Sequence, residues 1–135
     1  MTAERTLAII KPDAVERNLI GKIIAHLEGA GFVIRELQMT RLGEDEARRF
    51  YAVHSERPFY ASLVAFMTSG RCVPMVLERH SAVSALRETI GATDPARAAH
   101  GTVRALYAQS VERNAIHASD SPENAARVID FFFPS

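Results

Sequence analysis

Short apolar runs alternate with amphipathic stretches along the chain. Residues 5–10 (RTLAII) form a short, mostly apolar run that stops at Pro12, a pattern typical of a buried strand. Over residues 19–31, apolar side chains recur with helical spacing and two glycines follow, so we expect a helix there. Further apolar runs predict strands over residues 32–42 and 72–78.

The second half of the chain carries clear start and stop signals for helices. Ser121 and Pro122 are an N-cap residue followed by a first-turn proline, and Gly91 is a typical helix terminator. A fourth short strand is predicted for residues 115–119. Residues 92–113 show little periodicity beyond a short helix at 103–109, and a long segment of that kind in a small domain is often functional. The remaining helices are predicted over residues 43–54, 57–70, 80–91 and 121–133.

This order of elements predicts the fold class. Strands and helices alternate in a chain of 135 residues, which favours one sheet with helices packed against it in one domain spanning residues 1–135. We therefore expect an α/β (α+β) protein with the ferredoxin-like βαββαβ arrangement, a four-stranded antiparallel sheet covered by helices. Pro74 lies in the third predicted strand, which this order places centrally, although proline removes a ladder donor.

Composition narrows the partners and the compartment. The formal net charge is zero, so no overall field attracts nucleic acid or an anionic membrane. Cys72 is the single cysteine, no apolar run approaches the length of a membrane span, and no secretory leader is recognisable. We expect a cytoplasmic protein that binds neither nucleic acid nor membrane.

The candidate chemistry centres on His117 in the segment NAIHASDS, where small neighbours leave the imidazole accessible. The capped helix that follows presents free N–H groups that favour a nearby anion. Lys11, one of only two lysines, stands at the end of the first strand. Arginines, a lysine and hydroxyls are the groups that hold polyphosphates, and a neutral imidazole can attack phosphorus. The long loop and its borders supply Arg87, Thr93, Arg104, Arg113 and Asn114.

Other kinds of site find less support. The order His117-x-Ser119-Asp120 is unlike a hydrolase triad, whose members are seldom so close in sequence. The five histidines show no metal-ligand spacing, and no glycine-rich phosphate loop is present. A lone histidine is more often a core or surface residue than a nucleophile. These residues alone therefore indicate only a phosphate-handling α/β domain.

The sequence resembles the nucleoside diphosphate kinase family over nearly its whole length. Many matches in the right order are far more specific than one motif. The matching stretches are ERTLAIIKPDAV (4–15), FYAVHSERPFY (50–60), LVAFMTSG (63–70), IGATDP (90–95), GTVRALYA (101–108) and NAIHASDS (114–121).

The resemblance implies an enzyme that transfers the γ-phosphate of a nucleoside triphosphate, mainly ATP, to a nucleoside diphosphate by a ping-pong route. His117 would become phosphohistidine. Phe59 and Val111 would sandwich the base, and Mg²⁺ would bridge the phosphates, helped by Asp120 through water. The phosphates and ribose would be held by Lys11, Tyr51, Arg87, Thr93, Arg104 and Asn114.

Two departures from the family pattern lie close to the nucleophile. Ala118 stands where many members have glycine, and we predict a negative φ there because a small side chain suffices. Val128 stands where the family usually has a glutamate that orients the histidine, so we expect His117 to be active but less well oriented. The alternative function is a non-catalytic nucleotide-binding regulatory relative. A third hypothesis is a nucleic-acid-binding domain, but the chain is neutral and lacks a basic stripe, which does not favour this hypothesis.

The assembly can also be predicted. Phe131, Phe132 and Phe133 are consecutive, and a helix cannot turn all three toward one core, so we expect at least one to be exposed or covered by a partner. The family forms homo-oligomers, hexamers or tetramers built from dimers. Because many members carry a tail beyond the position of Ser135, a tetramer is expected here in preference to a hexamer.

Overall fold

Four strands form one antiparallel sheet in the computed structural model, which describes residues 3–134. The strands are β1 (Ala3–Ile10), β2 (Val33–Leu37), β3 (Val73–His80) and β4 (Ile116–Ala118). Their spatial order is β2-β3-β1-β4, which confirms the expected ferredoxin-like arrangement. Residues 1, 2 and 135 of the predicted domain lie outside the described part.

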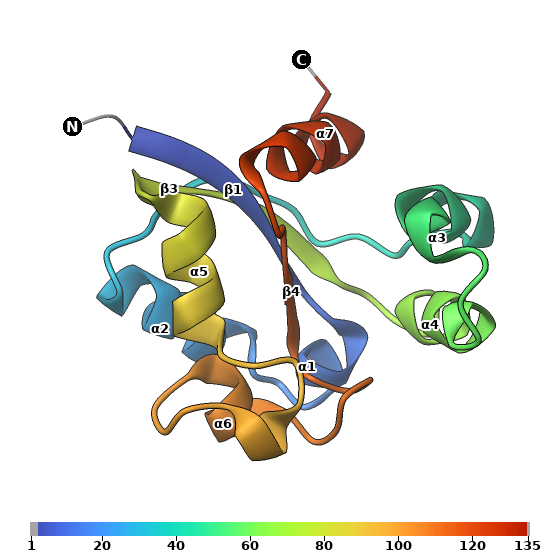
Figure 1. Ribbon diagram of the computed structural model, residues 1–135, viewed down its shortest axis with the longest axis horizontal. Helices are drawn as coiled ribbons and strands as arrows, with labels where there is room; N and C mark the ends of the chain where they lie inside the picture. The colour runs from blue at the N-terminus through green and yellow to red at the C-terminus, as the bar shows by residue number, and fades with distance from the viewer. Residues whose placement is uncertain (1–2, 135) are drawn as a thin grey trace.

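Helices cover both faces of the sheet (Figure 1). Helices α2 and α5 lie on one face, and α7, α3 and α4 lie toward the other. Within residues 3–134, no helix is both long enough and apolar enough to cross a membrane. The helices are α1 (Pro12–Glu16), α2 (Ile20–Gly29), α3 (Glu44–Phe50), α4 (Tyr60–Met67), α5 (Ala82–Ile90), α6 (Val103–Tyr107) and α7 (Pro122–Phe132), with 3-10 turns at Ala52–His54 and Pro95–Arg97.

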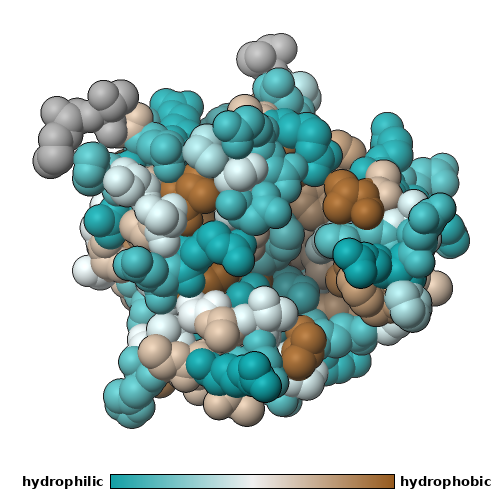
Figure 2. Space-filling view, in the orientation of Figure 1, coloured by the Kyte–Doolittle hydropathy of each residue, from teal (hydrophilic) through white to brown (hydrophobic). Residues whose placement is uncertain are grey.

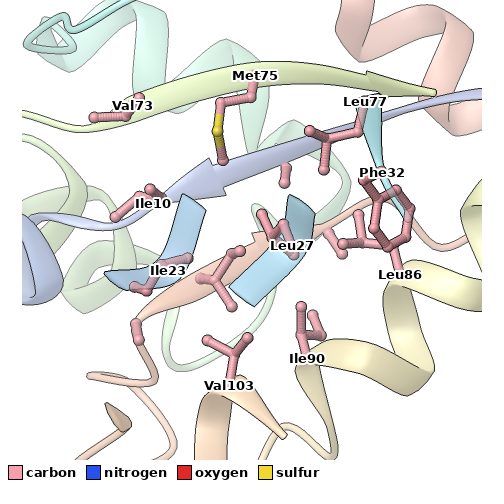
Figure 3. Close-up of a cluster of buried hydrophobic side chains, with 14 of the residues drawn as sticks. Ile10, Ile23, Leu27, Phe32, Val73, Met75, Leu77, Leu86, Ile90 and Val103 are labelled. Carbon is pink, nitrogen blue, oxygen red and sulfur yellow. The ribbon is translucent and has the colours of Figure 1, made fainter. Parts of the chain in front are cut away.

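The central position of strand β1 in the sheet explains why its sequence is continuously apolar. Ala8 and Ile10 face the core under α2 and α5, whereas Leu7 and Ile9 face the core under α3, α4 and α7. Both faces of the strand are thus buried, as expected for a central strand. Figure 3 shows the first core, in which β1 and β3 meet side chains from α2, α5 and α6.

The second core corrects the expectation for the three phenylalanines. Phe132 is buried, and Phe131 and Phe133 are half-buried against the same cluster, so none is exposed. Helix α7 ends at Phe132, and Phe133 leaves helical geometry with φ −132° and ψ 67°. Because the third ring is not on the helix, all three can pack together, with Phe50 contacting Phe131 and Phe132.

The predicted strand over residues 32–42 is too long, and Pro74 supplies the reason. Strand β2 ends at Leu37, and beyond it the contact with β3 continues through a hydrogen bond from Gln38 and an isolated bridge between Thr40 and Cys72. The Pro74 carbonyl accepts from the Gln38 N–H at 3.2 Å, so the missing Pro74 N–H faces the same side. The ladder therefore loses one hydrogen bond at the point where β2 stops, while Pro74 keeps its pairing with Ile9 of β1.

Other element ends differ in instructive ways. Pro12 ends β1 as predicted but also begins α1, which the pattern did not indicate. The helices predicted over residues 43–54 and 57–70 are shorter, since α3 ends at Phe50 and α4 begins at Tyr60. The Ser121 cap is confirmed, because its side chain accepts from the Asn124 N–H.

Candidate active site

One cavity of about 700 Å³ brings together all ten residues to which the family resemblance gives a role. It lies where α3, α4 and the turn between them face β4 and the long loop, and Figure 2 shows the surface hollowed beside the α3–α4 pair. The ten lining residues are Lys11, Tyr51, Phe59, Arg87, Thr93, Arg104, Val111, Asn114, His117 and Asp120. Arg113, a further candidate, is not among the lining residues, and its guanidinium lies 5.0 Å from the Phe66 ring centroid.

His117 is placed by the sheet. It lies on β4 opposite Ile9 of β1, so its side chain projects to the face that carries α3 and α7. The rings of Phe50 and Tyr51 meet the imidazole edge-on, with centroid distances of 5.5 and 6.3 Å. Phe50 and Tyr51 line the cavity together with His117, so the imidazole lies against an aromatic wall of that cavity.

The surroundings keep the imidazole uncharged. Burial, together with the positive charges of Lys11 and Arg104, lowers the pKa of His117 to about 3, against which Asp120 has a smaller, opposite effect. A histidine with this pKa is neutral at physiological pH. A neutral ring nitrogen keeps the lone pair that a nucleophile needs.

Hydrogen bonds join Lys11 to two other predicted residues, Asn114 and Thr93. Its ammonium donates to Asn114 Oδ1 and to the Glu112 carbonyl, both at 2.9 Å. Asn114 Nδ2 in turn donates to the Thr93 carbonyl at 3.2 Å. Burial lowers the pKa of Lys11 to about 8, so the ammonium is still charged at neutral pH. The network fixes a cation on the floor of the cavity.

Arg104 is held by two backbone carbonyls. Its guanidinium donates to Gly91 at 3.0 Å and to Ile116 at 2.7 Å, and Nε is buried without a partner. Burial, and then the charge of Arg87, lower the pKa of Arg104 to about 10. Gly91 has φ 89°, and a Cβ there would lie 2.5 Å from Thr102 Oγ1, so only glycine fits. This glycine presents its carbonyl to Arg104.

The other predicted residues lie nearer the mouth. Arg87 and Thr93 are exposed side chains on the cavity wall, and Asp120 accepts from Asn124 at 2.9 Å, which lowers the pKa of that carboxyl. Phe59 and Val111 are 48% and 56% exposed although both are apolar. Two exposed apolar side chains on one cavity are available to a flat ligand.

The two departures from the family pattern have different outcomes. The negative φ predicted at Ala118 is confirmed; the residue with a left-handed backbone is Ala115, with φ 75°. Val128 is buried in the cavity wall and accepts no hydrogen bond. Within residues 3–134, neither ring nitrogen of His117 has a hydrogen-bond partner that would replace a glutamate, and burial and charges alone account for its pKa.

Sequence reasoning missed several wall residues. Phe50 and His54 reach the cavity from α3 and the following turn, and Arg127 and Asn124 reach it from α7. The FYAVHSERPFY stretch contains the first two, but the resemblance implies roles there only for two of its other aromatic residues. Arg127 lies one turn after Asn124, whose side chain accepts from it at 2.8 Å.

The cavity offers little to a metal ion by itself. Within residues 3–134, no group of three or more His, Cys, Asp or Glu side chains is arranged to hold a metal. The lining carboxylates are Glu112 and Asp120, and Glu112 already accepts from Ser62. Four cationic side chains, Lys11, Arg87, Arg104 and Arg127, outnumber these two acids. The arrangement fits a ligand that brings negative charge.

Comparisons with known proteins identify the proteins that this chain resembles. A family model described as nucleoside diphosphate kinase matches residues 4–135. A nucleoside diphosphate kinase of Chlorobium luteolum is 58% identical over 130 residues, which cover 96% of this chain and 93% of that protein. The crystal structure of the Aquifex aeolicus nucleoside diphosphate kinase is 46% identical, with a TM-score of 0.95 and coverage of 98% and 96%. A Halobacterium salinarum nucleoside diphosphate kinase in complex with CDP is 39% identical, with a TM-score of 0.95 and coverage of 99% and 90%.

Proposed function

The chain belongs to the nucleoside diphosphate kinase family and is a phosphotransferase of that class, and we propose that it works through a phosphate carried on His117. The observation that carries this proposal is a neutral imidazole facing a cavity whose cations outnumber its acids. In this proposal a nucleoside triphosphate, mainly ATP, is the donor, and any nucleoside diphosphate is the acceptor. Residues 1–135 act as one domain.

The chemistry follows from the protonation state of His117. The lone pair of the neutral imidazole forms a bond to the γ-phosphorus, and the bond from that phosphorus to the bridging oxygen breaks. The nucleoside diphosphate leaves with the electron pair. In the second half-reaction, a terminal phosphate oxygen of the acceptor attacks the phosphohistidine, and the neutral imidazole is restored. No proton has to be removed from His117 in either step.

The cations hold the transferring group. Lys11 and Arg104 lie on fixed hydrogen-bond networks, so their charges are preorganised toward the equatorial oxygens of the transition state. Arg87, Thr93, Asn114 and Tyr51 complete the set that we assign to the phosphates and ribose. Charges fixed before the substrate arrives stabilise the transition state without reorganisation.

The base is held by apolar contact in this proposal. Phe59 and Val111 are exposed on the same cavity, and each offers a surface for stacking. Stacking does not distinguish one base from another, because every base has a π-face. We therefore propose low selectivity among bases.

Mg²⁺ is proposed to enter with the nucleotide. The residues present fit this, since the cavity has Asp120 as a nearby carboxylate but no ligand cluster within the described residues. When bound, such an ion would neutralise part of the charge of the phosphates. Asp120 would contact it through water.

The proposed assembly is a homo-oligomer, a tetramer in preference to a hexamer. The exposed edge of the sheet supports this, because β2 has no neighbour on its outer side within residues 3–134 and carries exposed Val33 and Leu37, followed by Met39. The buried, unpaired Cys72 suits the cytoplasmic location that we propose.

The proposal is tested by incubation with ATP labelled on the γ-phosphate and Mg²⁺. We expect an acid-labile, base-stable phosphoprotein that passes its label to GDP. His117→Ala removes the label, whereas His54→Ala, which changes the other histidine of the same cavity, keeps it. Label that persists in His117→Ala contradicts the assignment, and a wild-type chain that binds nucleotide without labelling indicates the non-catalytic relative.

A further inference from the structure

The chain makes an unusual turn two residues before the nucleophile. The Ile116 N–H donates to the Asn114 carbonyl at 2.9 Å, which closes a γ-turn with Ala115 at its centre. Ala115 has φ 75°, a conformation that is rare and strained in a residue with a Cβ. Such strain persists only where the surroundings hold the backbone in place.

The start of α1 supplies that hold. Asp13 Oδ2 accepts from the Ala115 N–H at 3.1 Å, and the Lys11 N–H donates to the Ala115 carbonyl at 2.9 Å. Both polar backbone groups of the strained residue are therefore bound to a segment about a hundred residues earlier in the sequence. Asp13 is 2% exposed, and its second oxygen is buried without a partner.

The turn sets several groups of the site at once. It orients Asn114, whose side chain accepts from the Lys11 ammonium, and Ile116, whose carbonyl accepts from Arg104. His117 is the next residue and takes its direction from the same backbone. A change at Ala115 moves the nucleophile relative to both cations.

Two simpler roles explain Asp13 less well. A cap for α1 is a weak explanation, because that helix has only five residues and the carboxylate accepts from a residue outside it. Lys11 attracts the Asp13 carboxylate and lowers its pKa, but the Lys11 ammonium donates its hydrogen bonds to Asn114 and Glu112, so this attraction does not explain the contact of Asp13 with Ala115. Burial raises the pKa of Asp13, so the fold keeps this carboxyl in a place unfavourable to its charge.

We propose that Asp13 is a positioning residue for His117, whose carboxylate holds Ala115 in its left-handed conformation and thereby aims the imidazole at the phosphorus. This inference rests on the proposed role of His117. It predicts that the hydrogen bond from Ala115 to Asp13 is needed because the Cβ of Ala115 makes the left-handed backbone strained. Glycine at position 115 adopts the same backbone without strain and makes Asp13 dispensable.

The test is the single-turnover rate of phosphate transfer from ATP to His117 over a range of ATP concentrations. Asp13→Ala is expected to lower the saturating rate by about tenfold or more, with little change in the half-saturating concentration, because the nucleophile is misplaced. Adding Ala115→Gly is expected to recover most of the rate. Asp13→Asn keeps an oxygen that can accept from Ala115 and is expected to retain most of it.

Ala118→Gly is the matched control for the recovery. It adds a glycine three residues away, on the other side of His117, but Ala118 has a negative φ and no strain to relieve, so no recovery is expected. If Asp13→Ala does not fold, the proposal is tested by comparing the double variant Asp13→Ala/Ala115→Gly with the single variant Ala115→Gly. The saturating rates of these two variants should agree within about threefold.

Several results overturn the proposal. The first is an unchanged saturating rate in Asp13→Ala. The second is a recovery of the rate by Ala118→Gly that equals the recovery by Ala115→Gly. The third is a loss of rate from Asp13→Ala that is the same in the Ala115→Gly background as in the wild-type background. A raised half-saturating concentration alone would assign Asp13 to nucleotide binding. If Asp13→Asn loses as much of the saturating rate as Asp13→Ala, the negative charge of Asp13, and not its hydrogen bond to Ala115, would be what matters. Absence of label in the wild-type chain refutes the proposed function instead.

Discussion

The Lys11 ammonium donates a 2.9 Å hydrogen bond to Asn114 Oδ1 across a sequence separation of 103 residues. Both residues are buried, and both lie beside a strand end, Lys11 after β1 and Asn114 before β4. Pairing of β1 with β4 brings these two strand ends together. The cation of the proposed phosphate site is thus positioned by the same register that positions His117.

Lys11→Arg is expected to be a damaging substitution although it keeps the charge. The ammonium fits between Asn114 Oδ1 and the Glu112 carbonyl, and a planar guanidinium cannot occupy that buried space without displacing one of them. We expect transfer to fall by roughly tenfold or more. Lys22→Arg, on α2, is the control and should leave steady-state transfer to GDP unchanged; equal rates in both variants would contradict the expectation.

The pH dependence should reflect two lowered pKa values. His117, with a pKa of about 3 in place of 6.5, stays neutral as the pH falls, so no acid limb near pH 6.5 is expected. Lys11, with a pKa of about 8, loses its charge as the pH rises through that value, so kcat/KM should fall there. The activity left in Lys11→Arg should lack this basic limb. A wild-type acid limb centred near 6.5 that tracks His117 would show an unperturbed imidazole.

Val128→Glu is expected to speed the phosphorylation of His117. Val128 lies in the cavity wall, and within residues 3–134 no group fixes either imidazole nitrogen. A carboxylate there would accept from one nitrogen and orient the other, an effect of about 1–2 kcal/mol, or roughly tenfold in rate. Val128→Gln separates orientation from charge, since its amide oxygen also accepts. A rate that stays the same or falls in Val128→Glu would mean that the orienter is not needed.

Gly91→Ala should destabilise the fold more than Gly101→Ala. Both glycines have positive φ, 89° and 86°, so each substitution carries a backbone cost of about 1–3 kcal/mol. Only at Gly91 does the new Cβ also meet Thr102, at 2.5 Å from Oγ1, whereas nothing lies within 4 Å at Gly101. Chemical denaturation measures the difference. Gly91→Ala should also slow transfer, because its carbonyl holds Arg104.

The oligomer is expected to depend on the free edge of β2. Val33→Lys/Leu37→Lys places charge on two exposed apolar positions of that edge and should shift the particle mass toward the monomer in light scattering. The control is Leu106→Lys, which changes a residue on α6 that is 51% exposed, and it should leave the particle mass unchanged. A wild-type monomer at micromolar concentration would refute the oligomer, and an unshifted edge variant would refute this interface.

Local sequence signals predicted the elements whose causes are local. The apolar run of β1 and the Ser121–Pro122 start of α7 are written in neighbouring residues, and both predictions are confirmed. The end of β2 was wrong because its cause, Pro74, lies in another strand. The expectation that Phe131, Phe132 and Phe133 cannot all turn toward one core was wrong, because α7 ends at Phe132 and Phe133 leaves the helix.

The features of the candidate site also divide into those that the sequence predicted and those that depend on the folded structure. The residues alone indicated phosphate chemistry at His117, Lys11 and Arg104, and the family resemblance added the roles. The strained backbone at Ala115 could not be foreseen, because alanine carries no signal for a positive φ. Its cause is the hydrogen bond from Ala115 to Asp13, a contact that exists only after the strands have paired.

Within residues 3–134, the strand that carries the proposed nucleophile pairs with β1 and with no other strand. Because β4 follows every other strand in the sequence, it is the last to leave the ribosome, and its pairing closes a loop that spans most of the chain. A partly synthesised chain therefore holds Lys11 and Arg87 without His117, the residue proposed to receive the phosphate. If His117 carries the phosphate as proposed, catalytic competence is a late event of synthesis, and a nascent chain stalled before β4 is expected to be inactive.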